Sequence, residues 1–317
     1  MFVQGSGRYW HTKGGGSCDA HPGRHHVHAS TAFATFPGAN GRIAYTEYGG
    51  ITIIHTIQPD GTDRTSLTTG FDPSWSANGR WLTFARRVDH KTDIFMIRDE
   101  GSAERRLTDT PRCEHDPSFA PGGRRVLYTS STGGTCLGGG YGELASGSIV
   151  TIQTDGSTRR RLRRGLSFAR PVFSPDGKHV AYTRGDEIRV MRSNGTHSRI
   201  LYEDRYLDGG RAYLDYSPDG RHIVFNRGTP GDVRRPLQPR EMGSDGSHPG
   251  PACTPGPFQP VFAPGGEGFA ASGHVGPLED FSTDILVGDC NQNRRLTNYW
   301  AVGGNAESPS WQPLPGG

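Results

Sequence analysis

An aromatic residue followed directly by a turn recurs six times along this chain, and this repeat constrains the fold more than any other feature. The turn reads Ser-Pro-Asp-Gly at residues 174–177, and the other copies are variants of that pattern. The six aromatic residues are Trp75, Phe119, Phe173, Tyr216, Phe262 and Trp311. They lie 44, 54, 43, 46 and 49 residues apart, and repeats of about 40 to 50 residues are typical of four-stranded propeller blades.

Each repeat continues in the same order after its turn. An alternating apolar strand follows, as at Trp81–Phe84, and then a second strand, as at Asp93–Ile97. A second turn contains Asp155-Gly156 or a similar pair, and the closing strands include Arg-Leu-Thr at 106–108 and 295–297. Proline sets φ at the first central position of the turn, while Asp, Asn and Gly tolerate the rest of its geometry, so the pattern predicts β-hairpins.

This order of aromatic residue, Ser-Pro-Asp-Gly, two strands, Asp-Gly and Arg-Leu-Thr resembles the TolB-type β-propeller repeat over roughly residues 37–313. The resemblance implies an all-β, six-bladed β-propeller of four-stranded antiparallel blades. The repeat occurs in periplasmic TolB proteins and in propeller domains attached to prolyl-oligopeptidase-like peptidases, so it implies a fold more than a chemistry. We expect neither the N-terminal α/β domain of TolB nor the peptidases' hydrolase domain here.

The two ends of the repeat region complement each other. Residues 41–68 supply strands two to four of a blade but lack its first strand, and a matching Pro-Ser-Trp occurs at Pro309–Trp311. We therefore expect the N- and C-terminal segments to pair in one composite blade, which closes the ring and leaves no open sheet edge.

The first 36 residues lack any alternation. We expect residues 1–36 to form a disordered Gly/His-rich tail and residues 37–317 to form the propeller. Cys18 and the nearby histidines could bind a soft metal, or the histidines could simply belong to a flexible tail. No signal peptide is visible, and no apolar run approaches the roughly 20 residues of a membrane-spanning helix, so we expect no membrane span.

Composition bears on the partners. With 35 Lys+Arg against 32 Asp+Glu, the net charge is only +3, so we expect no nucleic-acid partner. We also expect the protein to be a monomer. Six residues at 159–164 include five arginines, which we interpret as the solvated outer edge of a blade; contact with phosphates is the alternative.

Candidate ligand-binding residues lie where each blade begins, because propeller pockets form at the channel mouth. The position before the blade-start proline and the position preceding it supply Asp72, His115, Asp116, Arg170, Tyr213, Gln259 and Glu307. Their carboxylates could hold a cation such as Ca²⁺ or a basic peptide segment. The alternative is that Asp before Pro only caps a turn. No other cofactor is expected.

Four cysteines lie within the repeats. We predict two local disulfides, Cys113–Cys136 and Cys253–Cys290, with free buried thiols as the alternative. Disulfides indicate an oxidising compartment, so an extracytoplasmic location, periplasmic or secreted, is favoured although no signal peptide is visible.

Function is less constrained than fold. The sequence contains no Gly-x-Ser-x-Gly elbow, no His-Glu-x-x-His and no phosphate-binding loop. We favour a non-enzymatic propeller scaffold that binds a protein or peptide at the channel mouth and blade loops. Long insertions at 130–147 and 228–257, the second expected to replace a third strand, provide such loops. The alternative is a propeller-type lyase or hydrolase with a metal-assisted site in the central funnel.

Overall fold

The computed structural model describes residues 35–49, 51–132, 136, 146–166, 170–207, 212–228, 237–256, 258–274, 282–289, 291–299 and 305–315. All of them belong to one compact unit, Thr31–Gly317. Within these ranges the regular structure is β-strand, β1 to β24. No helix in the described part of the chain has the length and apolar character needed to cross a membrane.

Four sheets are separate, and each has four antiparallel strands in chain order. The first two contain β4 (Phe71–Trp75), β5 (Trp81–Val88), β6 (Lys91–Arg98) and β7 (Arg105–Arg106), then β8 (Cys113–Phe119), β9 (Arg125–Thr132), β10 (Ser146–Gln153) and β11 (Arg160–Leu166). The next two contain β12 (Val172–Phe173), β13 (His179–Arg184), β14 (Glu187–Arg192) and β15 (Arg199–Glu203), then β16 (Leu214–Tyr216), β17 (His222–Arg227), β18 (Gln238–Gly243) and β19 (Gly250–Pro251).

The remaining strands form one eight-stranded sheet. Its members are β20 (Phe258–Phe262), β21 (Phe269–His274), β22 (Thr283–Gly288), β23 (Asn293–Arg295), β24 (Asn305–Leu314), β1 (Ala39–Tyr48), β2 (Ile53–Ile57) and β3 (Thr65–Thr69). Six separate four-stranded sheets were predicted, and the difference arises at one place. A single parallel pair, Thr283 with Asn305, joins β22 to β24 and merges two groups of four strands.

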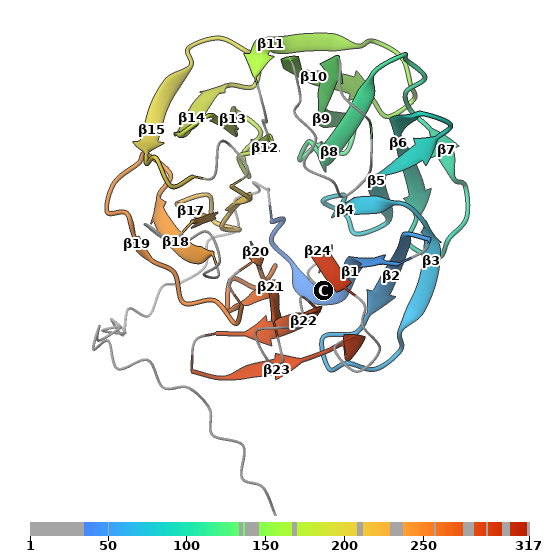
Figure 1. Cartoon of the computed structure of the whole chain (residues 1–317), viewed down its shortest axis with the longest axis vertical. Coiled ribbons are helices and arrows are strands. Elements are labelled where there is room, and N and C mark those ends of the chain that lie inside the picture. Colours follow the sequence, from blue (N-terminus) through green and yellow to red (C-terminus); the bar gives the residue numbers. More distant parts are fainter. Residues whose placement is uncertain are drawn as a thin grey trace, which may run out of the picture. The chain divides into compact units, whose positions relative to one another are not determined.

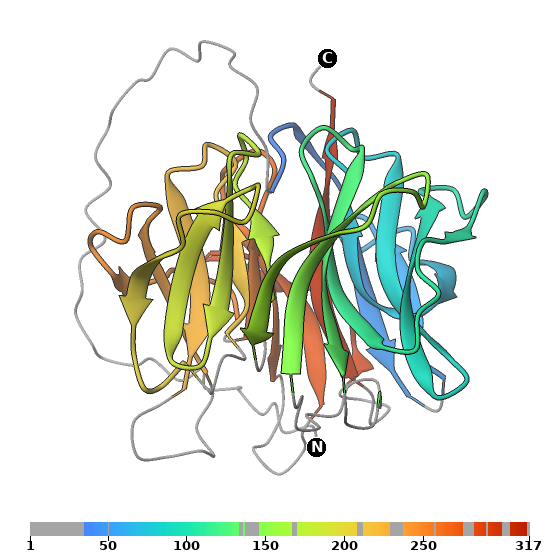
Figure 2. The same ribbon diagram turned by 90° about the horizontal axis from the view of Figure 1, so that it is seen from above.

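The chain ends pair as the sequence predicts. Strand β24 lies antiparallel to β1, with Trp311 opposite Ile43 and Asn305 opposite Tyr48. The sheets stand around a common axis with β4, β8, β12, β20 and β24 toward the centre (Figure 1). The view turned by 90° shows the strands running from one face of this ring to the other (Figure 2).

The Ser-Pro-Asp-Gly turns are held by their own side chains. Ser174 Oγ donates to Asp176 Oδ1 at 2.6 Å and accepts from the backbone N–H of His179 at 2.9 Å. Gly177 has φ +67°, a left-handed conformation that glycine adopts without steric cost. The same bonds recur around Ser217. The motif therefore stabilises the hairpin, and the carboxylate of its aspartate is already hydrogen-bonded within the turn.

The Arg-Leu-Thr motif serves a buried carboxylate on the third strand of its blade. Thr108 Oγ1 accepts from the backbone N–H of Ile94 at 2.9 Å, and Arg106 pairs with the fully buried Asp93 at 2.6 Å. In the eight-stranded sheet, Thr297 donates to the equivalent Asp284 at 2.6 Å. A buried charge requires such partners, so the motif ties the outermost strand to the one inside it.

The apolar core lies between neighbouring sheets. All six repeated aromatic residues are buried, from 0% exposure at Phe173 to 8% at Trp311. Phe119 packs in one cluster with Phe71 and Ile94 of the preceding sheet, and Phe173 packs with Leu127 in the next cluster. Full burial of such a side chain contributes roughly 1.5–3 kcal/mol, so these residues hold the sheets to one another.

One expectation about the insertions is wrong. Strand β18 is a regular third strand that pairs with β17 from His222–Gly243 to Arg227–Gln238, so residues 228–257 do not replace it. Its sequence hid the alternation because Met242 is the only large apolar side chain in it, and Met242 is buried.

The predicted Cys113–Cys136 disulfide is confirmed, with the two Cα atoms 5.4 Å apart. Cys253 is also disulfide-bonded. Its predicted partner Cys290 lies outside the described residues, as does Cys18.

Candidate functional site

An unusual backbone conformation recurs at the start of the innermost strands. The residue before the blade-start proline has positive φ in five places, namely Asp72 (53°), Asp116 (50°), Arg170 (30°), Gln259 (50°) and Ser308 (53°). Residues before proline normally adopt extended conformations, and positive φ is uncommon outside glycine. Pairing registers shift at the same points, between Phe71 and Ser74 for example. A strained conformation repeated around one axis suggests a functional constraint on these side chains.

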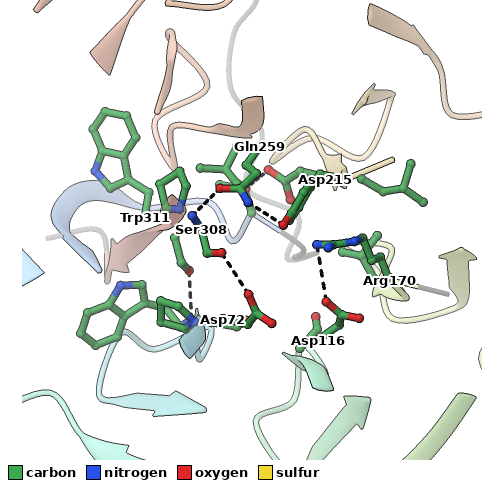
Figure 3. Close-up of a pocket in the computed structure, with 18 of the residues that line it drawn as sticks. Asp72, Asp116, Arg170, Asp215, Gln259, Ser308 and Trp311 are labelled. Carbon is green, nitrogen blue, oxygen red and sulfur yellow. Dashed lines mark hydrogen bonds and ion pairs between the residues drawn. The ribbon is translucent and has the colours of Figure 1, made fainter. Parts of the chain in front are cut away.

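These side chains line a central cavity of about 150 Å³. The first layer of its wall consists of Asp72, Asp116, Arg170, Tyr213, Gln259 and Ser308. Two residues further along each strand, the second layer consists of Ser74, Ser118, Val172, Asp215, Val261 and Ser310. Figure 3 shows carboxylates, a guanidinium and amide groups from different sheets converging on this space.

Hydrogen bonds connect four of the six first-layer residues. Gln259 Nε2 donates to the Tyr213 hydroxyl at 2.5 Å, and Gln259 Oε1 accepts from the backbone N–H of Ser308. Ser308 Oγ in turn donates to Asp72 Oδ1 at 3.0 Å (Figure 3). The amide of Gln259 is therefore fixed in orientation. The series of hydrogen bonds from Gln259 through Ser308 positions the Asp72 carboxylate on the cavity wall.

The charges are unevenly compensated. Arg170 Nη1 lies 3.5 Å from Asp116 Oδ1, and its guanidinium stacks 3.6 Å from the centre of the Tyr213 ring. Arg170 Nε is buried and has no hydrogen-bond partner among the described residues. Asp72 and Asp116 point toward one another in Figure 3. Within the described ranges, the Asp72 carboxylate accepts only from Ser308 and has no ion pair. The cavity lining thus contains three carboxylates, those of Asp72, Asp116 and Asp215, against the one guanidinium of Arg170.

Electrostatics follow from this arrangement. Burial and the neighbouring Asp116 carboxylate raise the pKa of Asp72 to about 6, although Arg170 acts in the opposite direction. A group in this state takes up either a proton or a cation near neutral pH.

Two residues assigned by sequence to the tail reach the cavity. Thr35 and Phe36 are buried and belong to its lining. Thr35 Oγ1 donates to Asp215 Oδ2 at 2.5 Å, and the same oxygen accepts from the backbone N–H of Phe262 at 2.8 Å. Burial raises the pKa of Asp215 to about 7. Sequence reasoning missed this carboxylate, although an Asp stands there where the other repeats have Ser or Val.

The cavity brings together five of the seven predicted residues: Asp72, Asp116, Arg170, Tyr213 and Gln259. His115 and Glu307 are not among its lining residues. The His115 Nε2 contacts Ser131 Oγ at 3.3 Å, and burial lowers its pKa. His115 and Asp116 are neighbours on β8, and successive side chains of a strand point to opposite faces, so the two diverge.

No group of three or more His, Cys, Asp or Glu side chains suited to a metal ion occurs among the described residues.

An all-β ring of four-stranded antiparallel blades around a polar central cavity is a β-propeller. The model of the TolB beta propeller domain (PD40) matches residues 35–247, more than half of the chain. The chain belongs to this family.

Individual proteins match over shorter stretches or with low identity. The uncharacterized peptidase YuxL of Bacillus subtilis is 26% identical over 139 residues, which cover 35% of this chain and 21% of that protein. The chain thus spans about a fifth of the curated relatives it matches.

Solved structures of other proteins share the fold. The crystal structure of TolB from Acinetobacter baumannii has a TM-score of 0.68 at 16% identity, covering 88% of this chain and 68% of that one. An oligogalacturonate lyase in complex with manganese has a TM-score of 0.55 at 10% identity, covering 85% and 77%. At these identities the likeness establishes the fold alone.

Proposed function

We propose that this chain is a propeller scaffold whose central cavity and blade loops bind a protein or peptide without catalysing a reaction on it, and that a basic side chain of this partner enters the cavity beside Asp72. The Asp72 carboxylate, which has no ion pair among the described residues, is the observation that carries the proposal. Arg170 is the cation of the same wall, and it forms an ion pair with Asp116. A lysine or arginine head would supply the second positive charge.

The size of the cavity supports a side chain over a free metabolite. Ligand pockets for drug-sized molecules measure roughly 300–1,000 Å³, whereas a cavity of about 150 Å³ holds a group the size of benzene. Most of the partner would then lie outside the cavity, on the channel mouth and the loops that connect the blades. Loops on a rigid scaffold commonly carry binding function.

Binding of this kind depends on pH. Asp72 must be ionised to attract a cation, and its pKa is about 6 in the free protein. A bound cation lowers that pKa, so affinity falls as the pH drops below 6.

We also propose six blades and an extracytoplasmic location. Dividing the eight-stranded sheet at its single parallel pair leaves two groups, β20–β23 and β24–β1–β2–β3, each with the strand order of the separate blades. The Cys113–Cys136 disulfide favours an oxidising compartment.

The binding proposal is tested with two tripeptide amides, acetyl-Gly-Lys-Gly and acetyl-Gly-Gln-Gly, titrated into the full chain and followed by NMR. We expect only the lysine peptide to shift signals of the cavity residues, and Asp72→Asn to abolish this preference. Asp60→Asn, at an exposed turn, is the matched control and should bind as the wild type does.

Equal binding of both peptides, or no binding, would overturn the proposal. Thermal shifts with Ca²⁺ or Mn²⁺ that disappear in Asp116→Asn would favour the metal-assisted lyase or hydrolase instead.

A further inference from the structure

A second polar cluster lies on β1, β2 and β3, apart from the cavity. Tyr45, His55 and Ser66 stand directly opposite one another on adjacent strands. Ser66 Oγ lies 3.2 Å from His55 Nδ1, and His55 Nε2 lies 2.7 Å from Glu47 Oε2. A hydroxyl, an imidazole and a carboxylate are therefore connected in series, which is the arrangement that activates a serine nucleophile.

The surroundings determine the tautomer of His55. A carboxylate oxygen at 2.7 Å can only accept, so Nε2 carries the proton and donates it to Glu47. The guanidinium of Arg64, 3.2 Å from the same nitrogen, cannot accept and shares Glu47 as its partner at 2.6 Å. Nδ1 is then unprotonated and accepts from the Ser66 hydroxyl. Burial and the charge of Arg64 both lower the pKa of His55, which favours this neutral form.

The corresponding site of another blade shows that the arginine–tyrosine hydrogen bond between strands forms without a histidine beside it. Arg159 Nε donates to the Tyr128 hydroxyl at 2.7 Å, just as Arg64 Nε donates to Tyr45 at 2.9 Å. The residue opposite Tyr128 is Val150, however, and no histidine takes part. An apolar residue therefore suffices at the position of His55.

Access and a cationic group complete the site. Ser66 is exposed on the outer strand, whereas His55 behind it is buried. Arg64 is 47% exposed, and among the described residues its Nη1 has no hydrogen-bond partner. That nitrogen is available to a developing negative charge or to an anionic substituent.

We propose that Ser66 is an activated nucleophile that hydrolyses small carboxylic esters, with His55 as general base, Glu47 as the residue that positions His55, and Arg64 as the group that binds the carbonyl oxygen. Ser66 Oγ forms a bond to the acyl carbon while its proton moves to His55 Nδ1. The bond to the alcohol then breaks, and the alcohol leaves with that proton. Water attacks the acyl-serine in the same way, releasing the acid and restoring the Ser66 hydroxyl.

The experiment is labelling of the full chain with a fluorophosphonate, followed by peptide mapping. We expect an adduct on Ser66 that is absent in Ser66→Ala, and a labelling rate at least about 100-fold lower in His55→Gln, since a general base contributes 10²–10⁴-fold. Ser198→Ala removes a serine that contacts Tyr182 and Arg189 and should be labelled like the wild type.

A second readout does not depend on a buried substitution. With His55 neutral above its lowered pKa, the rate should be flat between pH 7 and 8. Absence of a Ser66 adduct, a folded His55→Gln variant labelled at the wild-type rate, or a rate that rises tenfold per pH unit from 7 to 8 would each overturn the proposal.

Discussion

Replacing Asp215 by asparagine should stabilise the protein at neutral and alkaline pH. The carboxylate is buried, accepts from Thr35 and the backbone of Phe262, and has no ion pair among the described residues. Burial raises its pKa from 3.8 to about 7. The folded state thus holds this proton more tightly than the unfolded chain, so the contribution of Asp215 to stability is highest below pH 3.8 and declines as the pH rises toward 7.

The magnitude follows from the shift. A difference of about three pKa units corresponds to at most about 4 kcal/mol, and water entering the cavity would reduce it. An asparagine Oδ1 keeps both hydrogen bonds and carries no charge. We expect equal stability of the two proteins at pH 4 and a gain of about 2–4 kcal/mol for Asp215→Asn at pH 8.

Urea unfolding at pH 4, 6 and 8 measures this difference directly. Asp155 provides a control of opposite sign, because its exposed carboxylate accepts from Ser157 and this contact lowers its pKa. Asp155→Asn should therefore become less stable relative to the wild type as the pH rises. Parallel stability curves for Asp215→Asn and the wild type would show that the Asp215 carboxylate is not desolvated as the structure implies.

Two further substitutions and one deletion test the scaffold. Phe119→Ala should lower the unfolding free energy by about 3–5 kcal/mol, measured by the urea midpoint; a loss below 1 kcal/mol would contradict its place between sheets. Cys113→Ser opens a loop of 23 residues and should cost about 3 kcal/mol, a loss that a reductant should at least equal in the wild type, where it also reduces the disulfide of Cys253. Deleting Ser308–Gly317 removes most of β24 and should destabilise the whole ring; an unchanged melting temperature would refute its role in closure.

Local chemistry explains what could be predicted from sequence. The hairpin turns depend on residues within one tetrapeptide, so Ser174 and Asp176 predict their turn directly. The alignment of the repeats also placed Asp72 and Asp116 at the cavity, because each precedes the proline of an innermost strand. His115 was placed there only because it is next to Asp116, but neighbouring side chains of a strand point to opposite faces.

Long-range features could not be found in this way. Thr35 and Phe36 lie in a segment without periodicity, and their position depends on Asp215, 180 residues away. The pair between Thr283 and Asn305 depends on how two sheets approach one another, which no local pattern encodes.

The pairing of β1 with β24 also affects folding during synthesis on the ribosome. The Trp311 indole donates to the carbonyl of Gly41, 270 residues earlier. A ribosome adding 5–20 residues per second needs on the order of 10–50 s to cover that distance. Throughout this interval β1 lacks a neighbour on one side, so its exposed backbone is open to chaperones and to other nascent chains.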